Sequence, residues 1–130
     1  MTRRPRVVVV DDHAGFRATA RRLLEADGFE VIGEASDGPD GVAVARALQP
    51  DLLLVDVGLP TGDGFAVATD VAGAQAANLG PHIVLITSRD PGAYEERVRD
   101  SPALGLIAKD ELGGPRLRGL LARAVTKGDA

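Results

Sequence analysis

The sequence has no cysteine and no long hydrophobic run. Zero Cys among 130 residues excludes disulfide scaffolds, Cys-ligated zinc, iron–sulfur clusters and thiol catalysis. The longest aliphatic runs, Val7–Val10 and Leu52–Val55, have four residues each, far below the ~20 residues that a membrane-spanning helix needs. Behind the basic residues 1–6, the apolar stretch ends at Asp11 and Asp12, unlike the longer apolar region of a signal peptide. We therefore expect a soluble, cytoplasmic protein without a membrane partner.

An excess of basic residues is also missing. The chain has 15 Lys and Arg against 19 Asp and Glu, which gives a net charge of −4. Domains that bind nucleic acid by themselves usually carry a basic excess, so we expect no direct contact with nucleic acid. The length suits one domain. We expect a single domain over residues 1–130, with its core over about residues 5–125 and no output domain.

Short β-rich runs alternate with amphipathic segments along the whole chain. The expected strands are Arg6–Val10, Glu30–Ala35, Asp51–Val55, His82–Ile86 and Leu104–Ala108. The expected helices cover Ala14–Asp27, about Asp40–Leu48, a segment through Val67, Val71 and Ala74, about Ala93–Arg99, and Pro115–Val125. Apolar strands joined by helices favour a parallel sheet with helices on both faces. The sequence therefore predicts a doubly wound α/β fold.

Side chains with reactive chemistry follow the expected strands. Asp11 and Asp12 follow the first, Asp56 the third, Thr87 and Ser88 the fourth, and Lys109 the fifth. Ligands of doubly wound sheets bind outside the carboxyl ends of the strands, where these side chains would converge. Three neighbouring carboxylates repel one another unless a cation such as Mg²⁺, which prefers oxygen ligands, lies between them. The set contains what phosphoryl transfer to a carboxylate needs: a nucleophile, a metal site, a lysine and a hydroxyl donor.

Four stretches carry a resemblance to a known family: VVVVDDHAGFR, PDLLLVDVGLPTGDGF, IVLITS and GLIAKD. They place Thr87 31 residues after Asp56, and Lys109 22 residues after Thr87. In this order they resemble the receiver domain of two-component response regulators, of the CheY-like superfamily. The DDH stretch and the Asp110 after Lys109 are most similar to receivers of the NarL and LuxR type. The resemblance covers about residues 5–125 and implies a flavodoxin-like (βα)5 fold with the sheet order 2-1-3-4-5.

The resemblance also implies a role for each residue at this edge. Asp56 would accept a phosphoryl group from a sensor histidine kinase or a phosphotransfer protein, with Mg²⁺ as the cofactor. Thr87 and Lys109 would contact the phosphoryl group. The metal ligands would be Asp11, Asp12, Asp56 and the backbone carbonyl of Gly58. The resemblance thus implies a phosphorylation-dependent signalling switch that is not an enzyme.

The region expected to carry the output departs from the pattern of many receivers. Many receivers have an aromatic residue on the fifth strand at the position of Leu106 in this chain. The segment Arg89–Pro102 carries Pro and Gly around a weak helix. We expect this segment to carry the signal. The face of the fourth helix, fifth strand and fifth helix is expected to bind a downstream protein, or a second copy in a homodimer formed on phosphorylation. His13 is interpreted as a solvated residue of the first helical turn and not as a ligand.

Several alternative functions are compatible with parts of this pattern. The chain could be the receiver fragment of a DNA-binding transcriptional regulator, or a pseudo-receiver that is not phosphorylated and acts as an interaction module. A phosphatase with an aspartyl nucleophile would need Asp-x-Asp where this chain has Asp11-Asp12-His13. A cobalamin site would need Asp-x-His-x-x-Gly, and Gly15 stands at the wrong spacing. The Thr-, Ser- and Gly-rich loop of a flavin-phosphate site is missing after the first strand.

Overall fold

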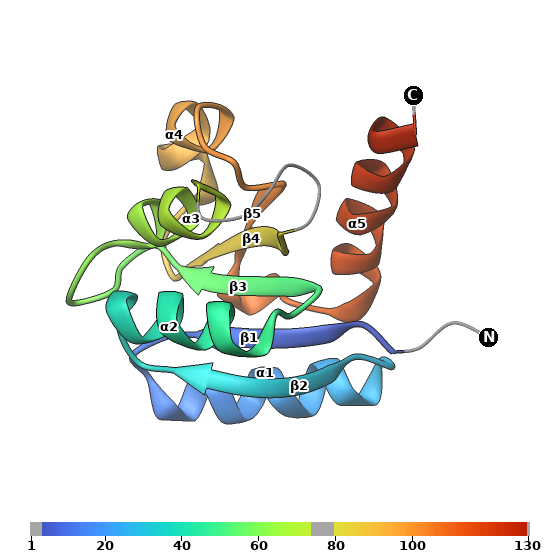
Figure 1. Ribbon diagram of the computed structural model, residues 1–130, viewed down its shortest axis with the longest axis horizontal. Coiled ribbons are helices and arrows are strands. Elements are labelled where there is room, and N and C mark those ends of the chain that lie inside the picture. Colours follow the sequence, from blue (N-terminus) through green and yellow to red (C-terminus); the bar gives the residue numbers. More distant parts are fainter. Residues whose placement is uncertain (1–3, 74–79, 130) are drawn as a thin grey trace.

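A parallel sheet forms the centre of the molecule. In the computed structural model, which describes residues 4–73 and 80–129, the strands are β1 (Arg6–Val10), β2 (Glu30–Ala35), β3 (Leu52–Asp56), β4 (His82–Thr87) and β5 (Gly105–Ala108). They lie in the order β2-β1-β3-β4-β5, and every pairing is parallel. The carboxyl ends of the strands therefore meet at one edge (Figure 1). The doubly wound, flavodoxin-like fold and its strand order are confirmed.

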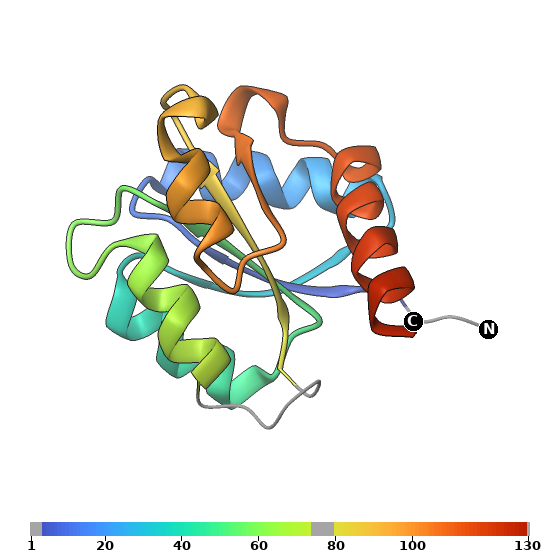
Figure 2. The ribbon, with the colours of Figure 1, turned by 90° about the horizontal axis from the view of Figure 1, so that it is seen from above.

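Helices cover both faces of this sheet. They are α1 (Ala14–Ala26), α2 (Gly38–Leu48), α3 (Gly64–Gly73), α4 (Glu95–Arg99) and α5 (Gly114–Asp129), with the 3-10 turns η1 (Pro91–Tyr94) and η2 (Lys109–Glu111). Figure 2 shows α1 and α5 on one side of the sheet and α2 and α3 on the other. Ala74, expected in the third helix, lies outside the described residues. Across the described ranges, no helix is long and apolar enough to cross a membrane.

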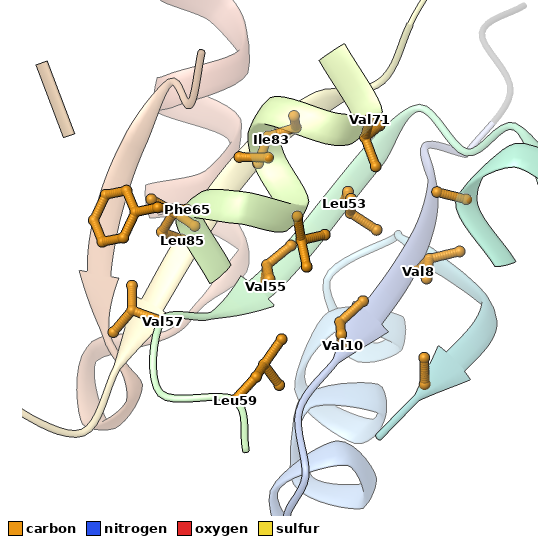
Figure 3. Close-up of a cluster of buried hydrophobic side chains, with 14 residues drawn as sticks. Val8, Val10, Leu53, Val55, Val57, Leu59, Phe65, Val71, Ile83 and Leu85 are labelled. Carbon is orange, nitrogen blue, oxygen red and sulfur yellow. The ribbon is translucent and has the colours of Figure 1, made fainter. Parts of the chain in front are cut away.

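The core has two layers, one on each face of the sheet. Val8 and Val10 of β1 face α2 and α3, and Val7 and Val9 face α1 and α5. Figure 3 shows the first layer, in which side chains of β1, β3 and β4 pack against α3. Because both faces are covered, the central strands are apolar at successive positions and not only at alternate ones. Complete burial of one such side chain stabilises the fold by about 1.5–3 kcal/mol.

The ends of α2 follow from its flanking residues. The carboxylate of Asp37 accepts a hydrogen bond from the backbone N–H of Asp40 at 2.8 Å, which caps the first turn. The helix therefore begins at Gly38, two residues before the predicted start. Gln49 adopts a left-handed conformation with φ of 48° at the other end, and Pro50 cannot continue the helix.

The fourth helix differs from its prediction. The expected helix Ala93–Arg99 is a 3-10 turn followed by an α-helix of five residues, and neither contains a buried residue. The carboxylate of Asp90 accepts a hydrogen bond from the N–H of Gly92 at 3.1 Å, and Pro91 starts the tighter turn. Only Tyr94 and Val98 of these two elements pack partly against the core. Few apolar contacts therefore fasten α4 to the sheet.

A hydrogen bond joins the end of α1 to the start of α5, and its removal tests how firmly α5 is attached. The backbone N–H of Gly114 donates to Oδ2 of Asp27 at 3.0 Å. We expect Asp27→Ala to lower the free energy of unfolding by about 1 kcal/mol, as for the loss of a helix cap, measured by urea denaturation. Asp100→Ala, at an exposed residue, is the control. An equal loss in both variants contradicts the assignment.

Candidate functional site

Lys109 bridges two buried carboxylates at the carboxyl edge of the sheet. Asp11 directly follows β1 and is fully buried, and Asp56 ends β3 with 5% exposure. Nζ of Lys109 lies 2.6 Å from Oδ2 of Asp11 and 3.3 Å from Oδ2 of Asp56. Because β4 lies between β3 and β5, the lysine side chain reaches past the end of β4 to make these contacts. Three strands of the sheet are thus joined by one ammonium group.

The surroundings of Lys109 keep it charged. Burial alone would lower the pKa of Lys109, but the short contact with Asp11 and the negative charge of Asp56 outweigh burial and raise it. The ammonium is the partner of Oδ2 of Asp11, which has no other hydrogen-bond donor among the described residues. Nζ also lies 4.7 Å from the ring centroid of Phe16, within the range of a cation–π interaction. The two carboxylates therefore share a neighbour that is positively charged at neutral pH.

A second, more exposed part of the site adjoins the buried pair. Oδ1 of Asp11 accepts the backbone N–H of His13 at 2.8 Å. Nδ1 of His13 lies 3.2 Å from Oδ1 of Asp11 and 3.3 Å from Oδ1 of Asp12. Ligand atoms of Asp11, Asp12, His13 and Asp56 all lie within 4.8 Å of one another. The structure therefore brings the three predicted acids together, and it adds an imidazole.

The loop after β3 holds the Asp56 carboxylate in place. The N–H of Gly58 donates to Oδ1 of Asp56 at 3.1 Å. A Cβ at Gly64 would lie 2.5 Å from the backbone oxygen of Asp56, so only glycine fits where α3 begins beside the end of β3. Gly58 is thus adjacent to the cluster, as predicted, and its observed contact is made by its N–H.

Thr87 ends β4 on the other side of Lys109. It is 1% exposed, and Oγ1 accepts the backbone N–H of Arg89 at 3.0 Å. Thr87 and Lys109 both line a hollow of about 430 Å³ between the loops that follow β4 and β5. No hydrogen bond joins Thr87 to Asp56 among the described residues. The predicted hydroxyl is therefore at the correct edge, and its oxygen is held by its own loop.

Arg17 connects α1 to the backbone of the site and was not singled out from the sequence. Its guanidinium donates to the backbone oxygen of Asp11 and, through Nε, to Oε1 of Glu34 at 2.9 Å. Arg21 donates to Oε2 of the same glutamate at 2.8 Å. The Arg21 hydrogen bond, opposed by partial burial and helped by Arg17, lowers the pKa of Glu34. Two arginines four residues apart on one helix were the only signal in the sequence, and it does not identify their partner.

A second contact that the sequence did not predict links the loop after β3 to α4. Nη2 of Arg97 lies 3.2 Å from Oδ2 of Asp63, and its Cζ lies 4.1 Å from the ring centroid of Phe65. The ring of Phe65 also lies 6.1 Å from that of Tyr94. Asp63 accepts the N–H of Ala66 at 2.9 Å and so caps α3 as well. The loop that follows Asp56 is thus in direct contact with α4.

The donor set fits a hard divalent cation. Ligands on opposite sides of Mg²⁺, at about 2.1 Å each, are about 4.2 Å apart, close to the observed limit of 4.8 Å for the ligand atoms of this cluster. Asp12 is partly exposed, with 31% of its side chain accessible, so a hydrated ion can approach from that side. Asp11, Asp12 and Asp56 would hold such an ion by their carboxylates. When bound, it would supply positive charge beside the Asp56 carboxylate.

Comparison with protein families matches the sequence of this chain to a known group. The family model of the response regulator receiver domain matches residues 7–118. The chain belongs to the response regulator receiver domain family. Receiver domains are parts of two-component signalling systems, and the receiver predicted from the four sequence stretches is confirmed.

Individual relatives include receivers of transcription regulators. The chain is 37% identical over 106 residues to the transcription regulator BvgA of Bordetella pertussis, covering 82% of this chain and 49% of that protein. The receiver domain of the response regulator NarL of Mycobacterium tuberculosis is 31% identical, with a TM-score of 0.76 and coverage of 97% and 96%. A LuxR-family response regulator of Aurantimonas is 25% identical, with a TM-score of 0.79 and coverage of 96% and 86%. The chain spans about half the length of the curated relatives it matches.

Because Lys109 pairs with two buried carboxylates, we expect its removal to lower the stability of this receiver domain. Lys109→Met leaves Asp11 and Asp56 buried without their cation. Loss of one partner of a buried ion pair costs about 3–5 kcal/mol, and the partial exposure of Lys109 favours the low end, about 3 kcal/mol. Urea denaturation in EDTA measures this loss.

The matched control for Lys109→Met is Arg22→Met, which removes an exposed positive charge from α1. A loss no larger than that of the control would show that Asp11 and Asp56 do not depend on the ammonium.

Proposed function

We propose that this receiver domain is a phosphorylation-dependent switch of a two-component system, in which Asp56 accepts a phosphoryl group from a sensor histidine kinase or a phosphotransfer protein. The observation that carries the proposal is the ammonium of Lys109 beside both Asp11 and Asp56. A carboxylate that gains a phosphoryl group gains negative charge, and this edge already holds a positive group within 3.3 Å of it.

The transfer is a displacement at phosphorus. An oxygen of the Asp56 carboxylate forms a bond to phosphorus while the bond to the donor's histidine nitrogen breaks, and that nitrogen keeps the electron pair. Lys109 then pairs with a phosphoryl oxygen. Asp11, Asp12, Asp56 and the backbone carbonyl of Gly58 would hold Mg²⁺, which would supply positive charge beside the transferred group.

Thr87 supplies the hydroxyl of the mechanism. Its Oγ1 is used as an acceptor by the Arg89 N–H, and its hydrogen has no acceptor among the described residues, so it is available to a phosphoryl oxygen. A movement of Thr87 toward that oxygen would pull on the loop that begins at Arg89. The phosphorylation state is thereby transmitted to η1 and α4.

The proposal treats residues 1–130 as one cytoplasmic signalling unit and not as an enzyme. Its output is a contact with a downstream protein, or with a second copy of the chain, through the face of α4, β5 and α5. Leu106 and Leu120 are half-buried on this face and line a hollow of about 370 Å³. This face adjoins the Arg97 contacts, so a change near Asp56 reaches it.

A second candidate function is favoured by the relatives. BvgA and PdtaR are named as transcription regulators, and the chain matches 49% of each. In this candidate, the same phosphorylation switch controls a DNA-binding segment outside the present sequence. Both candidates share Asp56 as the acceptor and differ only in what the α4, β5 and α5 face contacts.

Phosphorylation of Asp56 is tested by intact-mass measurement. Acetyl phosphate with Mg²⁺ is expected to add one phosphoryl group to the wild type, and none with EDTA or in Asp56→Asn. Beryllofluoride with Mg²⁺ should raise Tm, because a ligand that binds only the folded state stabilises it. Asp63→Asn, in the same loop, is the control and should still be phosphorylated. No mass gain and an unchanged Tm would identify a pseudo-receiver.

The output is tested by hydrogen exchange with and without beryllofluoride. We expect residues 89–102 to change their exchange rates most, because a segment with little buried surface opens at low free energy. β5 should change little. Arg97→Met should reduce the response of this segment, whereas Arg99→Met, on the same helix, should not. A change confined to Leu104–Ala108 would assign the switch to β5.

A further inference from the structure

The imidazole of His13 stands where a metal ligand would stand. Two neighbouring ligands of one ion at about 2.1 Å are about 3.0 Å apart in octahedral geometry and about 3.4 Å apart in tetrahedral geometry. Nδ1 of His13 lies 3.2 Å from Oδ1 of Asp11 and 3.3 Å from Oδ1 of Asp12. Both spacings fall inside this interval, so they are compatible with a cation that contacts Nδ1 of His13 together with Oδ1 of either acid.

Helix capping does not explain where the His13 side chain lies. The residue is the N-terminal cap of α1, but its side chain makes no capping hydrogen bond. Nδ1 of His13 is within hydrogen-bond distance of Oδ1 of Asp11, at 3.2 Å, but this contact is longer than the 2.7–2.9 Å of charge-assisted hydrogen bonds, and the same oxygen already accepts the backbone N–H of His13 at 2.8 Å. The side chain is 68% exposed, so it can turn toward an ion. Its exposure was predicted correctly, but its position beside both acids was not expected.

The cation of Lys109 does not occupy this place. Nζ of Lys109 pairs with Oδ2 of Asp11 and Oδ2 of Asp56, whereas the imidazole faces the Oδ1 atoms of Asp11 and Asp12. The buried half of the cluster therefore has its positive charge, and the exposed half presents carboxylate oxygens and an imidazole to solvent. A divalent cation would fill the exposed half without displacing the lysine.

We propose that His13 is a further metal ligand and that it makes this site prefer Zn²⁺, a borderline divalent cation, over Mg²⁺. The proposal deepens the proposed function and rests on the metal site named there. Carboxylate and carbonyl oxygens suit Mg²⁺, whereas an imidazole nitrogen adds affinity for first-row transition metals and zinc. The exposed position of His13 leaves room for water on the remaining coordination positions. The chemical class of the ligand is thus a divalent ion that accepts mixed oxygen and nitrogen donors.

Calorimetric titration of the full chain with Mg²⁺, Mn²⁺ and Zn²⁺ tests the proposal. His13→Gln is expected to weaken Zn²⁺ binding by about tenfold or more and Mn²⁺ binding by less. Its affinity for Mg²⁺ should change by less than about twofold. The matched control is His82→Gln, because His82 is the second of the two histidines and lies at the first residue of β4, at the opposite edge of the sheet. It should leave all three affinities unchanged.

Ligation is read directly from the imidazole nitrogen signals in ¹⁵N nuclear magnetic resonance. Zn²⁺ should shift Nδ1 of His13 and leave His82 unshifted. If Mg²⁺ binds and Asp12→Asn abolishes that binding, but His13→Gln leaves Zn²⁺ affinity and selectivity unchanged, the inference about His13 is wrong while the proposed metal site stands. If no divalent cation binds, both the inference and the metal site of the proposed function are overturned.

Discussion

The contact on which this edge of the sheet depends is the ammonium of Lys109 between the carboxylates of Asp11 and Asp56. β1 and β3 are neighbouring parallel strands, so the acids at their carboxyl ends are brought together although their negative charges repel each other. Two buried carboxylates in that position require a positive partner. Lys109 supplies it from beyond β4. Charge balance at this point therefore joins the centre of the sheet to its β5 side.

The cluster has two halves with different access to solvent. The inner half is formed by Oδ2 of Asp11, Asp56 and Lys109, and the ammonium offsets part of its negative charge within the protein. The outer half is formed by Asp12, His13 and Oδ1 of Asp11, and it opens to water. A lysine and a divalent ion can therefore both contact Asp11, the lysine at Oδ2 and the ion at Oδ1.

The site is attached to both helical layers. On the α1 side, Arg17 binds the backbone oxygen of Asp11 and the Glu34 carboxylate. On the α3 side, Arg97 of α4 binds Asp63 and covers Phe65, in the loop and helix that follow Asp56. The α4 segment is otherwise held by few apolar contacts. The loop after β3 therefore contacts α4 directly. This contact does not involve position 106, which is Leu here and aromatic in many receivers.

The sequence by itself determined the doubly wound fold and the set of residues at the carboxyl edge. Apolar strands and interleaved amphipathic helices specify both, since the side chain that follows a parallel strand must lie at that edge. The resemblance then supplied the strand order, which the structure confirms, and the roles of Asp11, Asp12, Asp56, Gly58, Thr87 and Lys109, which stay predictions.

The tertiary structure decided which of these side chains touch and which further residues join them. The Arg97–Asp63 pair spans 34 positions and the Arg17–Glu34 pair spans 17. Such contacts depend on the rotation and height of each helix over the sheet, which many side chains set together. His13 is close in sequence to its acids, but the direction of its ring follows from the turn into α1. Local pattern does not encode that direction, because the conformation of this turn depends on how α1 packs against the sheet.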